Sequence, residues 1–232
     1  MNTSFYVSLD KDALYHNIEY LREYKQKELL PVIKANAYGH NSLLIAKALY
    51  DFNLKTWAVA RFSEAISITE YMMNNFSIND FKILVFESLN DDYSFLEKYP
   101  QICPTINSIK DLKNALANNI PIDRLSLKID FGFGRNGVKE EEVDELKNLI
   151  KFNSLKFLSI FSHLFSASYT DGLEVIRKFT EVVNKLGRNN FQMIHLQNAA
   201  GIYNYDVEVV THIRTGMLTY GLQEAGFYDL DL

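Results

Sequence analysis

Short runs of apolar residues alternate along this chain with longer segments in which apolar residues recur at helical spacing. The short runs predict about nine strands, and the amphipathic segments between them predict helices. Strands that alternate with helices in this way run parallel and are joined by helical crossovers. The pattern therefore predicts an α/β protein. The predicted strands cover residues 5–9, 29–34, 56–60, 82–86, 102–106, 125–130, 155–161, 191–196 and 207–213.

Eight strand–helix units are enough to close a (β/α)8 barrel, a fold of roughly 200 residues or more. The alternative is an open, doubly wound sheet. No G-x-G-x-x-G sequence follows a predicted strand, so the commonest fingerprint of that fold is missing. The chain also contains no linker-like or low-complexity tract. We therefore expect residues 1–232 to form one TIM-type barrel domain, with Phe5–Leu9 left over as an extra N-terminal strand.

One lysine ends the second predicted strand, in the stretch Pro31–Asn41, PVIKANAYGHN. The apolar residues before Lys34 predict a buried strand, and the asparagines and glycine after it predict a turn before the next helix. Because desolvation favours a neutral amine, a lysine in such a place can act as a nucleophile. A solvated strand end is the simpler interpretation of a single lysine, so the surrounding pattern has to decide between them.

Most of the predicted strands end at a polar residue. In a barrel, the C-terminal ends of the strands meet at the rim where active sites are built. A lysine, two arginines, a histidine and an amide at one rim predict an anionic ligand that many donors hold. The residues at these ends are Lys34, Arg61, Glu87, Asp130, His163, Asn198 and Arg214.

Lys128 lies inside the predicted strand Leu125–Asp130. Strand parity places its side chain on the face opposite Leu127 and Ile129. Since the apolar face packs on the helices, Lys128 is expected to point into the barrel, where it needs a partner or a modification. A shifted or edge-like strand would instead leave it solvated.

Two short loops indicate where a phosphate would bind. Barrels often place a phosphate after strands 7 and 8, which here precede Asn198–Gly201 and Arg214–Met217. Both loops contain small residues, so their backbone N–H groups can approach a ligand closely. A candidate catalytic lysine and a phosphate site in one barrel together predict pyridoxal phosphate as the cofactor.

Composition limits the partners and the compartment. The net charge is -5 and no basic block occurs, which argues against nucleic acid or an anionic membrane as a partner. Cys103 is the single cysteine, so no intrachain disulfide or zinc-binding cysteine cluster is expected. His163, His195 and His212 could form a metal site with Asp130, although no close His-x-His pair occurs. No signal peptide or membrane-spanning run is visible, so we expect a cytoplasmic globular domain.

Several segments resemble the alanine racemase family, in the family's own order. PVIKANAYGHN is similar to the pyridoxal-lysine motif of that family, and LKIDFGFGRNG resembles its Lys-x-Asp-Thr-Gly-Met-x-Arg-x-Gly segment. FSHLFSA, IHLQNAAG and IRTGMLTYGL resemble three further segments. The resemblance covers nearly the whole chain. It implies a pyridoxal phosphate-dependent amino-acid racemase that interconverts L- and D-alanine.

The resemblance also implies a role for each matching residue. Lys34 would hold pyridoxal phosphate as an imine and act as the base on one face of the substrate. Tyr38 and the backbone at Gly216 and Met217 would contact the phosphate. Arg214 would hydrogen-bond the pyridine nitrogen and, because arginine keeps its proton, leave that nitrogen unprotonated.

Further matching residues would bind the substrate or complete the cofactor site. Arg135 would bind the cofactor's phenolic oxygen or the substrate carboxylate. Lys128 would be carbamylated by CO2 and become an anion that orients Arg135. His163 would support Arg214, and Asn198 would line the cofactor site. Beside it, Ala199 stands where the family usually has a phosphate-binding serine, so one hydroxyl donor is lost.

The chain departs from the family pattern in other places. Phe131 and Phe133 replace the usual Thr and Met of the carbamate loop, and Thr215 replaces a proline. The family continues into a second, mostly β domain, whose tyrosine acts on the opposite face of the substrate across a homodimer. Racemisation needs such a second proton-transfer group, and nothing in this chain is assigned that role. The resemblance therefore implies the barrel of a larger homodimeric racemase, with Phe5–Leu9 belonging with the absent β domain.

Three hypotheses remain open on the sequence alone. The first is the barrel of an alanine racemase, or of a serine-preferring racemase of the same family. The second is a stand-alone pyridoxal phosphate-binding module of the kind linked to cofactor homeostasis, although those proteins lack the KANAYGH-type motif. The third is a metal- or sugar-phosphate-dependent barrel enzyme that uses Lys34 for a different substrate.

Overall fold

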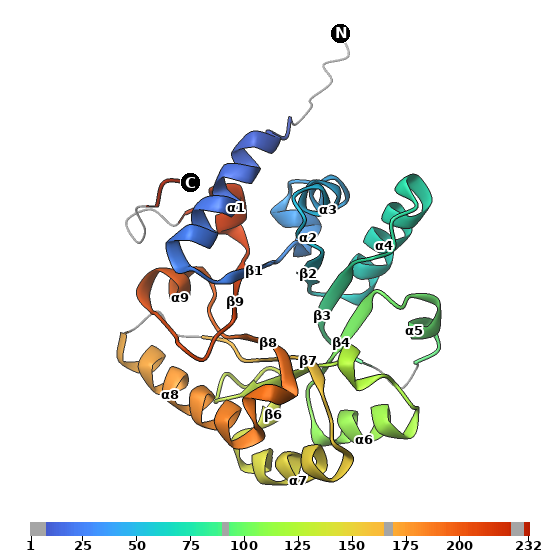
Figure 1. Cartoon of the computed structure of the whole chain (residues 1–232), viewed down its shortest axis with the longest axis vertical. Helices are drawn as coiled ribbons and strands as arrows, with labels where there is room; N and C mark the ends of the chain where they lie inside the picture. Colours follow the sequence, from blue (N-terminus) through green and yellow to red (C-terminus); the bar gives the residue numbers. More distant parts are fainter. Residues whose placement is uncertain (1–7, 90–92, 165–168, 224–229) are drawn as a thin grey trace.

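The computed structural model describes residues 8–89, 93–164, 169–223 and 230–232. Within these ranges the strands occupy the middle of the molecule and the helices lie around them (Figure 1). The strands are β1 (Glu28–Pro31), β2 (Thr56–Val59), β3 (Lys82–Ser88), β4 (Ile102–Ile106), β5 (Ser126–Asp130), β6 (Val138–Lys139), β7 (Phe157–Phe161), β8 (Phe191–His195) and β9 (His212–Thr215). The helices are α1 (Lys11–Lys25), α2 (Lys34–Tyr38), α3 (Ser42–Asp51), α4 (Phe62–Phe76), α5 (Phe95–Lys98), α6 (Ile109–Ala117), α7 (Val143–Asn153), α8 (Tyr169–Leu186) and α9 (Ala199–Asn204). Short 3-10 turns lie at Ile122–Arg124, Glu140–Glu142, Arg188–Asn190 and Met217–Tyr220.

Eight of the described strands form a closed parallel ring. One sheet has the order β2-β3-β4-β5-β7-β8, and a second pairs β1 with β9. Two joints connect them: Ile33 N–H donates to Ala58 O at 2.8 Å, and Thr211 N–H donates to Ile194 O at 2.9 Å. The short strand β6 lies off this ring and pairs with the end of β5. The (β/α)8 barrel predicted from the alternation is confirmed.

The expected extra strand Phe5–Leu9 falls mostly outside the described residues, and its last two residues have no strand structure. The first described element is α1, which begins where the pattern predicts it. Asp10 Oδ1 accepts the N–H groups of Asp12 and Ala13, at 2.9 and 3.1 Å, and so caps the helix. One face of α1 packs into the core through Leu14, Ile18 and Leu21.

Two strand boundaries differ from the prediction. β1 ends at Pro31 rather than at Lys34, because the chain turns left-handed over residues 35–38. β9 begins at His212 rather than at Val207, because Val210 N–H donates to the Val207 carbonyl and closes a turn. Apolar runs can therefore extend beyond the strands that they predict.

The apolar core has two parts. The larger part fills the space between the strands and the surrounding helices, and the smaller part fills the barrel interior. Burial on both faces explains why the strands read as nearly continuous apolar runs. In the described part of the chain, no helix has both the length and the apolar character needed to span a membrane. The interior cluster contains Leu30, Val32, Ala58, Leu84, Cys103, Leu158, Phe161 and Met193.

Candidate active site

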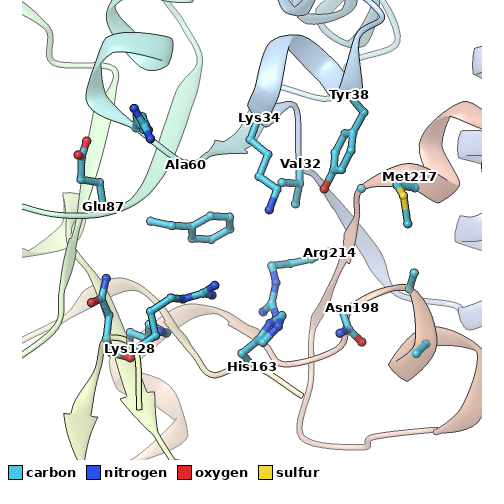
Figure 2. A pocket seen from close by; sticks show the side chains of 17 residues that line it. Val32, Lys34, Tyr38, Ala60, Glu87, Lys128, His163, Asn198, Arg214 and Met217 are labelled. Atoms are coloured by element: carbon cyan, nitrogen blue, oxygen red, sulfur yellow. The ribbon is translucent and has the colours of Figure 1, made fainter. Parts of the chain in front are cut away.

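A cavity of about 700 Å³ lies at the C-terminal ends of the strands (Figure 2). Its volume is in the range of small-molecule sites. Of the strand-end residues named from the sequence, all but Asp130 line it. The residues that the family resemblance assigns to the site also line it, namely Lys34, Tyr38, Lys128, Arg135, His163, Asn198, Ala199, Arg214, Gly216 and Met217. Arg61 and Glu87 line it as expected, and the structure adds Val32, Ala60, Phe86, Asn136 and Ala200.

Lys34 and Tyr38 reach the cavity from the two ends of a left-handed turn. Residues 35–38 all have positive φ, between 51° and 55°. Such a conformation costs a non-glycine residue roughly 1–2 kcal/mol, so contacts from the surrounding structure have to hold it. Figure 2 shows both side chains pointing from α2 into the cavity, and Lys34 Nζ lies 6.0 Å from the centre of the Tyr38 ring.

Neighbouring side chains stabilise this turn. Asn36 Oδ1 accepts the N–H of Ser42 at 2.9 Å, at the start of α3. His40 Nδ1 donates to the Ala37 carbonyl at 3.0 Å. The His40 ring also stacks on Tyr220, with the ring centres 4.5 Å apart. These contacts connect the turn to the start of α3 and, through His40, to Tyr220.

The Tyr38 hydroxyl lies against Gly216. A Cβ at position 216 would be 2.6 Å from Tyr38 Oη, so a side chain there would displace the hydroxyl. Burial raises the pKa of Tyr38, although the neighbouring Arg214 lowers it in part, so the hydroxyl keeps its proton at neutral pH. A phenolic donor beside bare glycine backbone is suited to a phosphate group.

Arg214 is a buried cation of the site, with 6% of its surface exposed. Its Nη2 donates to Leu196 O at 2.8 Å, and its Nη1 donates to His195 Nδ1 at 3.0 Å. Burial lowers the pKa of His195, which stays neutral and has Nε2 3.2 Å from Ser159 Oγ. Burial also lowers the pKa of Arg214 to about 10, so it remains charged at neutral pH. The resemblance implies that His163 supports Arg214, whereas Arg214 donates these hydrogen bonds to His195 and Leu196.

His163 and Lys128 lie among positive charges. Burial, with Arg214 and Arg135 nearby, lowers the pKa of His163 to about 4, so its ring is neutral. Burial and Arg135 also lower the pKa of Lys128 to about 8. Lys128 is 5% exposed and donates to the Asn136 carbonyl. The neutral amine is the form that attacks CO2, and a pKa near 8 makes that form accessible at physiological pH.

Arg135 reaches the cavity from the loop after β5. The Asp130 carboxylate accepts the N–H groups of Phe133 and Gly134, at 3.0 and 2.9 Å, and so folds the loop. The guanidinium carbon of Arg135 lies 4.8 Å from the centre of the Phe133 ring. That ring lies 5.2 Å from the ring of His163. Phe133 therefore packs between two polar groups of the site.

The metal site considered from the sequence is not assembled. Asp130, His195 and His212 do not line the cavity with His163. Within residues 8–89, 93–164, 169–223 and 230–232, no group of three or more His, Cys, Asp or Glu side chains is arranged to hold a metal ion.

Comparison with known proteins identifies the family. Residues 9–224 match the sequence profile described as the alanine racemase N-terminal domain. The chain belongs to the alanine racemase family. It is 33% identical over 226 residues to the alanine racemase of Fusobacterium nucleatum, a match that covers 93% of this chain and 60% of that one. With the alanine racemase of Staphylococcus saprophyticus the identity is 29% over 234 residues, covering 97% and 59%. The chain thus spans about 60% of the length of these curated relatives.

Solved alanine racemases share this barrel. The structure from Clostridium difficile gives a TM-score of 0.79 at 24% identity and covers 95% of this chain and 60% of that one. The structure from Bartonella henselae, which has covalently bound pyridoxal phosphate, gives 0.75 at 23% identity and covers 92% and 60%. At these identities the similarity supports the alanine racemase barrel as the fold.

Two contacts of this alanine racemase barrel were missed in the sequence. His195 has the parity of Met193, which lies in the interior cluster, so an inward position beside Arg214 was deducible. Asn136 accepts from Lys128 through its backbone carbonyl. A backbone acceptor leaves no side-chain pattern, so no signal in the sequence could have indicated it.

Proposed function

We propose that this chain is the cofactor-binding barrel of a pyridoxal phosphate-dependent racemase that interconverts L- and D-alanine. The observation that carries the proposal is the convergence, in one cavity of an alanine racemase family member, of Lys34, Tyr38, Arg214 and Gly216. The covalently bound pyridoxal phosphate of the Bartonella relative supports the choice of cofactor.

The donors of the cavity fit a phosphorylated pyridine. The Tyr38 hydroxyl and the backbone at Gly216 and Met217 would hold the phosphate. A Cβ at position 216 would lie 2.6 Å from that hydroxyl, so glycine is what lets the two donors lie side by side. Asn198 lines the same wall. Ala199 offers no hydroxyl, so the phosphate would depend more on backbone N–H groups than in family members with a serine.

Pyridoxal phosphate, when bound, supplies an electron sink that makes the α-proton of an amino acid removable. Lys34 would bind the cofactor covalently and exchange that proton at Nζ on one face of the substrate. Arg214 would donate a hydrogen bond to the pyridine nitrogen and, as a cation held by β8, keep its own proton. That nitrogen would then stay unprotonated, which would limit side reactions such as transamination.

Arg135 would bind the substrate carboxylate, and Lys128 would orient it. As an ammonium, Lys128 repels Arg135, and this repulsion contributes to its lowered pKa. Carbamylation by CO2 would replace the cation with an anion and turn repulsion into attraction. His163, neutral among these cations, would complete the wall near the cofactor.

Racemisation needs a second proton-transfer group on the opposite face of the substrate. The family resemblance supports a tyrosine from outside this barrel, supplied across a homodimer of the full-length protein. Phe5–Leu9 would belong with that second domain. The proposal also includes alanine rather than serine as the substrate and a cytoplasmic location.

The first test is to add pyridoxal phosphate to the protein, record the visible spectrum, reduce with borohydride and map the modified residue. We expect a visible band and a label on Lys34, both lost in Lys34→Ala and kept in Lys47→Ala, which changes a lysine paired with Asp51. A label on another lysine would contradict the assignment. The full-length protein should convert L-alanine to D-alanine faster than it converts L-serine.

A further inference from the structure

Glu64 joins the turn after Lys34 to the end of β2. It lies in the first turn of α4, three residues after the N-cap residue Arg61. Its Oε2 accepts the N–H groups of Ala60 and Arg61, at 2.9 and 3.0 Å. Its Oε1 accepts the N–H of Ala35 at 2.6 Å. One carboxylate therefore binds three backbone donors from two separate loops.

Helix capping accounts for only part of this arrangement. The bond to Arg61 N–H belongs to a capping box, which stabilises the start of α4. The bond to Ala35 instead spans 29 residues of sequence and reaches the residue next to Lys34. Ala35 is the first of the left-handed residues, with φ of 51°. A charge-assisted bond of this kind is roughly twice as strong as a neutral one, so it can offset strain in the turn.

A second carboxylate steadies the same helix. Glu87 Oε2, at the end of β3, accepts the N–H of Phe62 at 2.9 Å. The first turn of α4 is therefore bonded to the chain after β1 through Glu64 and to β3 through Glu87. This connection gives Glu64 a fixed position from which to hold the turn beside Lys34.

We infer that Glu64 is a positioning residue for Lys34. Through the N–H of Ala35 it holds the left-handed turn that directs Lys34 and Tyr38 into the cavity. The role of the turn in catalysis rests on the proposed function. The hydrogen bond from Ala35 to Glu64 does not, because it lies within the chain and needs no cofactor. The two can therefore be tested separately.

Hydrogen exchange tests the hold on the turn without cofactor. Glu64→Ala removes the acceptor of Ala35 N–H, so the amides of residues 35–38 should exchange roughly ten-fold faster or more than in the wild type. Glu142→Ala is the matched control, because Glu142 Oε2 accepts Lys139 N–H at 2.9 Å in the capping box of another helix. The control should leave exchange at residues 35–38 unchanged. Unchanged exchange in Glu64→Ala would overturn the inference.

Cofactor binding gives the second readout, on the intact protein. Glu64→Ala should bind pyridoxal phosphate roughly ten-fold more weakly or worse and change the visible circular dichroism, which reports how the cofactor is oriented. Glu142→Ala should change neither the affinity for pyridoxal phosphate nor the visible circular dichroism, even if it lowers the melting temperature as much as Glu64→Ala does. Glu64→Gln should be intermediate, because its one amide oxygen can serve only one of the two loops.

The outcomes separate the inference from the proposed function. A wild type that attaches no pyridoxal phosphate at Lys34 contradicts the proposed function, while the exchange experiment still decides the role of Glu64. If the wild type and Glu64→Ala bind pyridoxal phosphate with equal affinity and give identical dichroism, the inference about Glu64 is contradicted and the proposed function is unaffected.

Discussion

Burial and the neighbouring Arg135 destabilise the positive charge of Lys128 in the folded protein. Removing that charge should therefore stabilise the protein at neutral pH when CO2 is absent. Lys128→Met removes the ammonium and keeps an unbranched apolar stem. Burial lowers the pKa of Lys128 from 10.5 to about 8. Each pKa unit corresponds to about 1.4 kcal/mol, so holding the charged form in the folded state costs about 3 kcal/mol.

The dependence on pH follows from counting protons. The folded pKa lies below the unfolded value, so between about pH 8 and 10.5 the unfolded chain binds more protons at Lys128. Stability therefore rises with pH across that window, and below about pH 8 the penalty is present in full. From pH 7 to 9.5, the wild type should gain about 2 kcal/mol relative to Lys128→Met.

Urea unfolding of both proteins in CO2-free buffer, at several pH values from 7 to 9.5, measures this difference. Groups that titrate far from Lys128 cancel in the comparison. Lys110→Met, at an exposed position of α6, is the control and should show no such pH dependence. Added bicarbonate should stabilise only proteins that keep Lys128, and gentle intact-mass measurement should show one labile CO2 adduct. A difference between wild type and Lys128→Met that stays constant with pH would refute the shifted pKa.

Three further changes test other parts of the cavity. Gly216→Ala should weaken binding of inorganic phosphate and pyridoxal phosphate roughly ten-fold at a stability cost below about 1 kcal/mol, because the new methyl group meets the end of the Tyr38 side chain. Titration followed by fluorescence measures both affinities, and unchanged values would contradict a phosphate site at Gly216 and Tyr38. Arg214→Lys should lower the free energy of unfolding by about 2–3 kcal/mol, because an ammonium cannot keep both hydrogen bonds that the guanidinium makes at the end of β8. An unshifted midpoint of urea unfolding would count against that contribution of the two bonds. Phe133→Met should raise the KM of the full-length enzyme up to about five-fold with little change in kcat, because it removes a cation–π contact worth about 0.5–1 kcal/mol from Arg135. Steady-state kinetics measure both constants, and an unchanged KM would argue against a role for that contact.

The position of the cavity was predictable because it depends on rules that hold along the whole chain. Parallel strands joined by helices bring all their C-terminal ends to one face. The polar residues that follow β1, β7 and β8, which are Lys34, His163 and Asn198, therefore had to meet there. Parity within β5 was enough to direct Lys128 inward. Each of these deductions uses only the local period of a strand and the closure of the barrel.

Contacts that depend on particular side chains were less accessible. The resemblance implied His163 as the support of Arg214, yet His195 makes the hydrogen bond. Both histidines lie near strand ends, and which one reaches the guanidinium depends on its depth in the barrel. His195 is the last residue of β8 and fully buried, whereas His163 lies two residues beyond β7. A shift of two residues along a strand moves a side chain by about 6–7 Å, which decides whether it bonds.

The turn after Lys34 shows why local rules fail at this site. Asn36 and Gly39 indicated a turn, but alanines at positions 35 and 37 oppose positive φ, because their Cβ atoms crowd the backbone in that region. Local contacts of Asn36 and His40 stabilise the conformation, and Glu64 adds a distant one from a helix whose first turn has the sequence of an ordinary capping box. A strained turn that local propensity disfavours, held by a carboxylate from elsewhere in the fold, is the pattern expected where a protein fixes a reactive side chain at the expense of stability. The strained residues directly follow Lys34, so their conformation bears on where the Lys34 side chain lies.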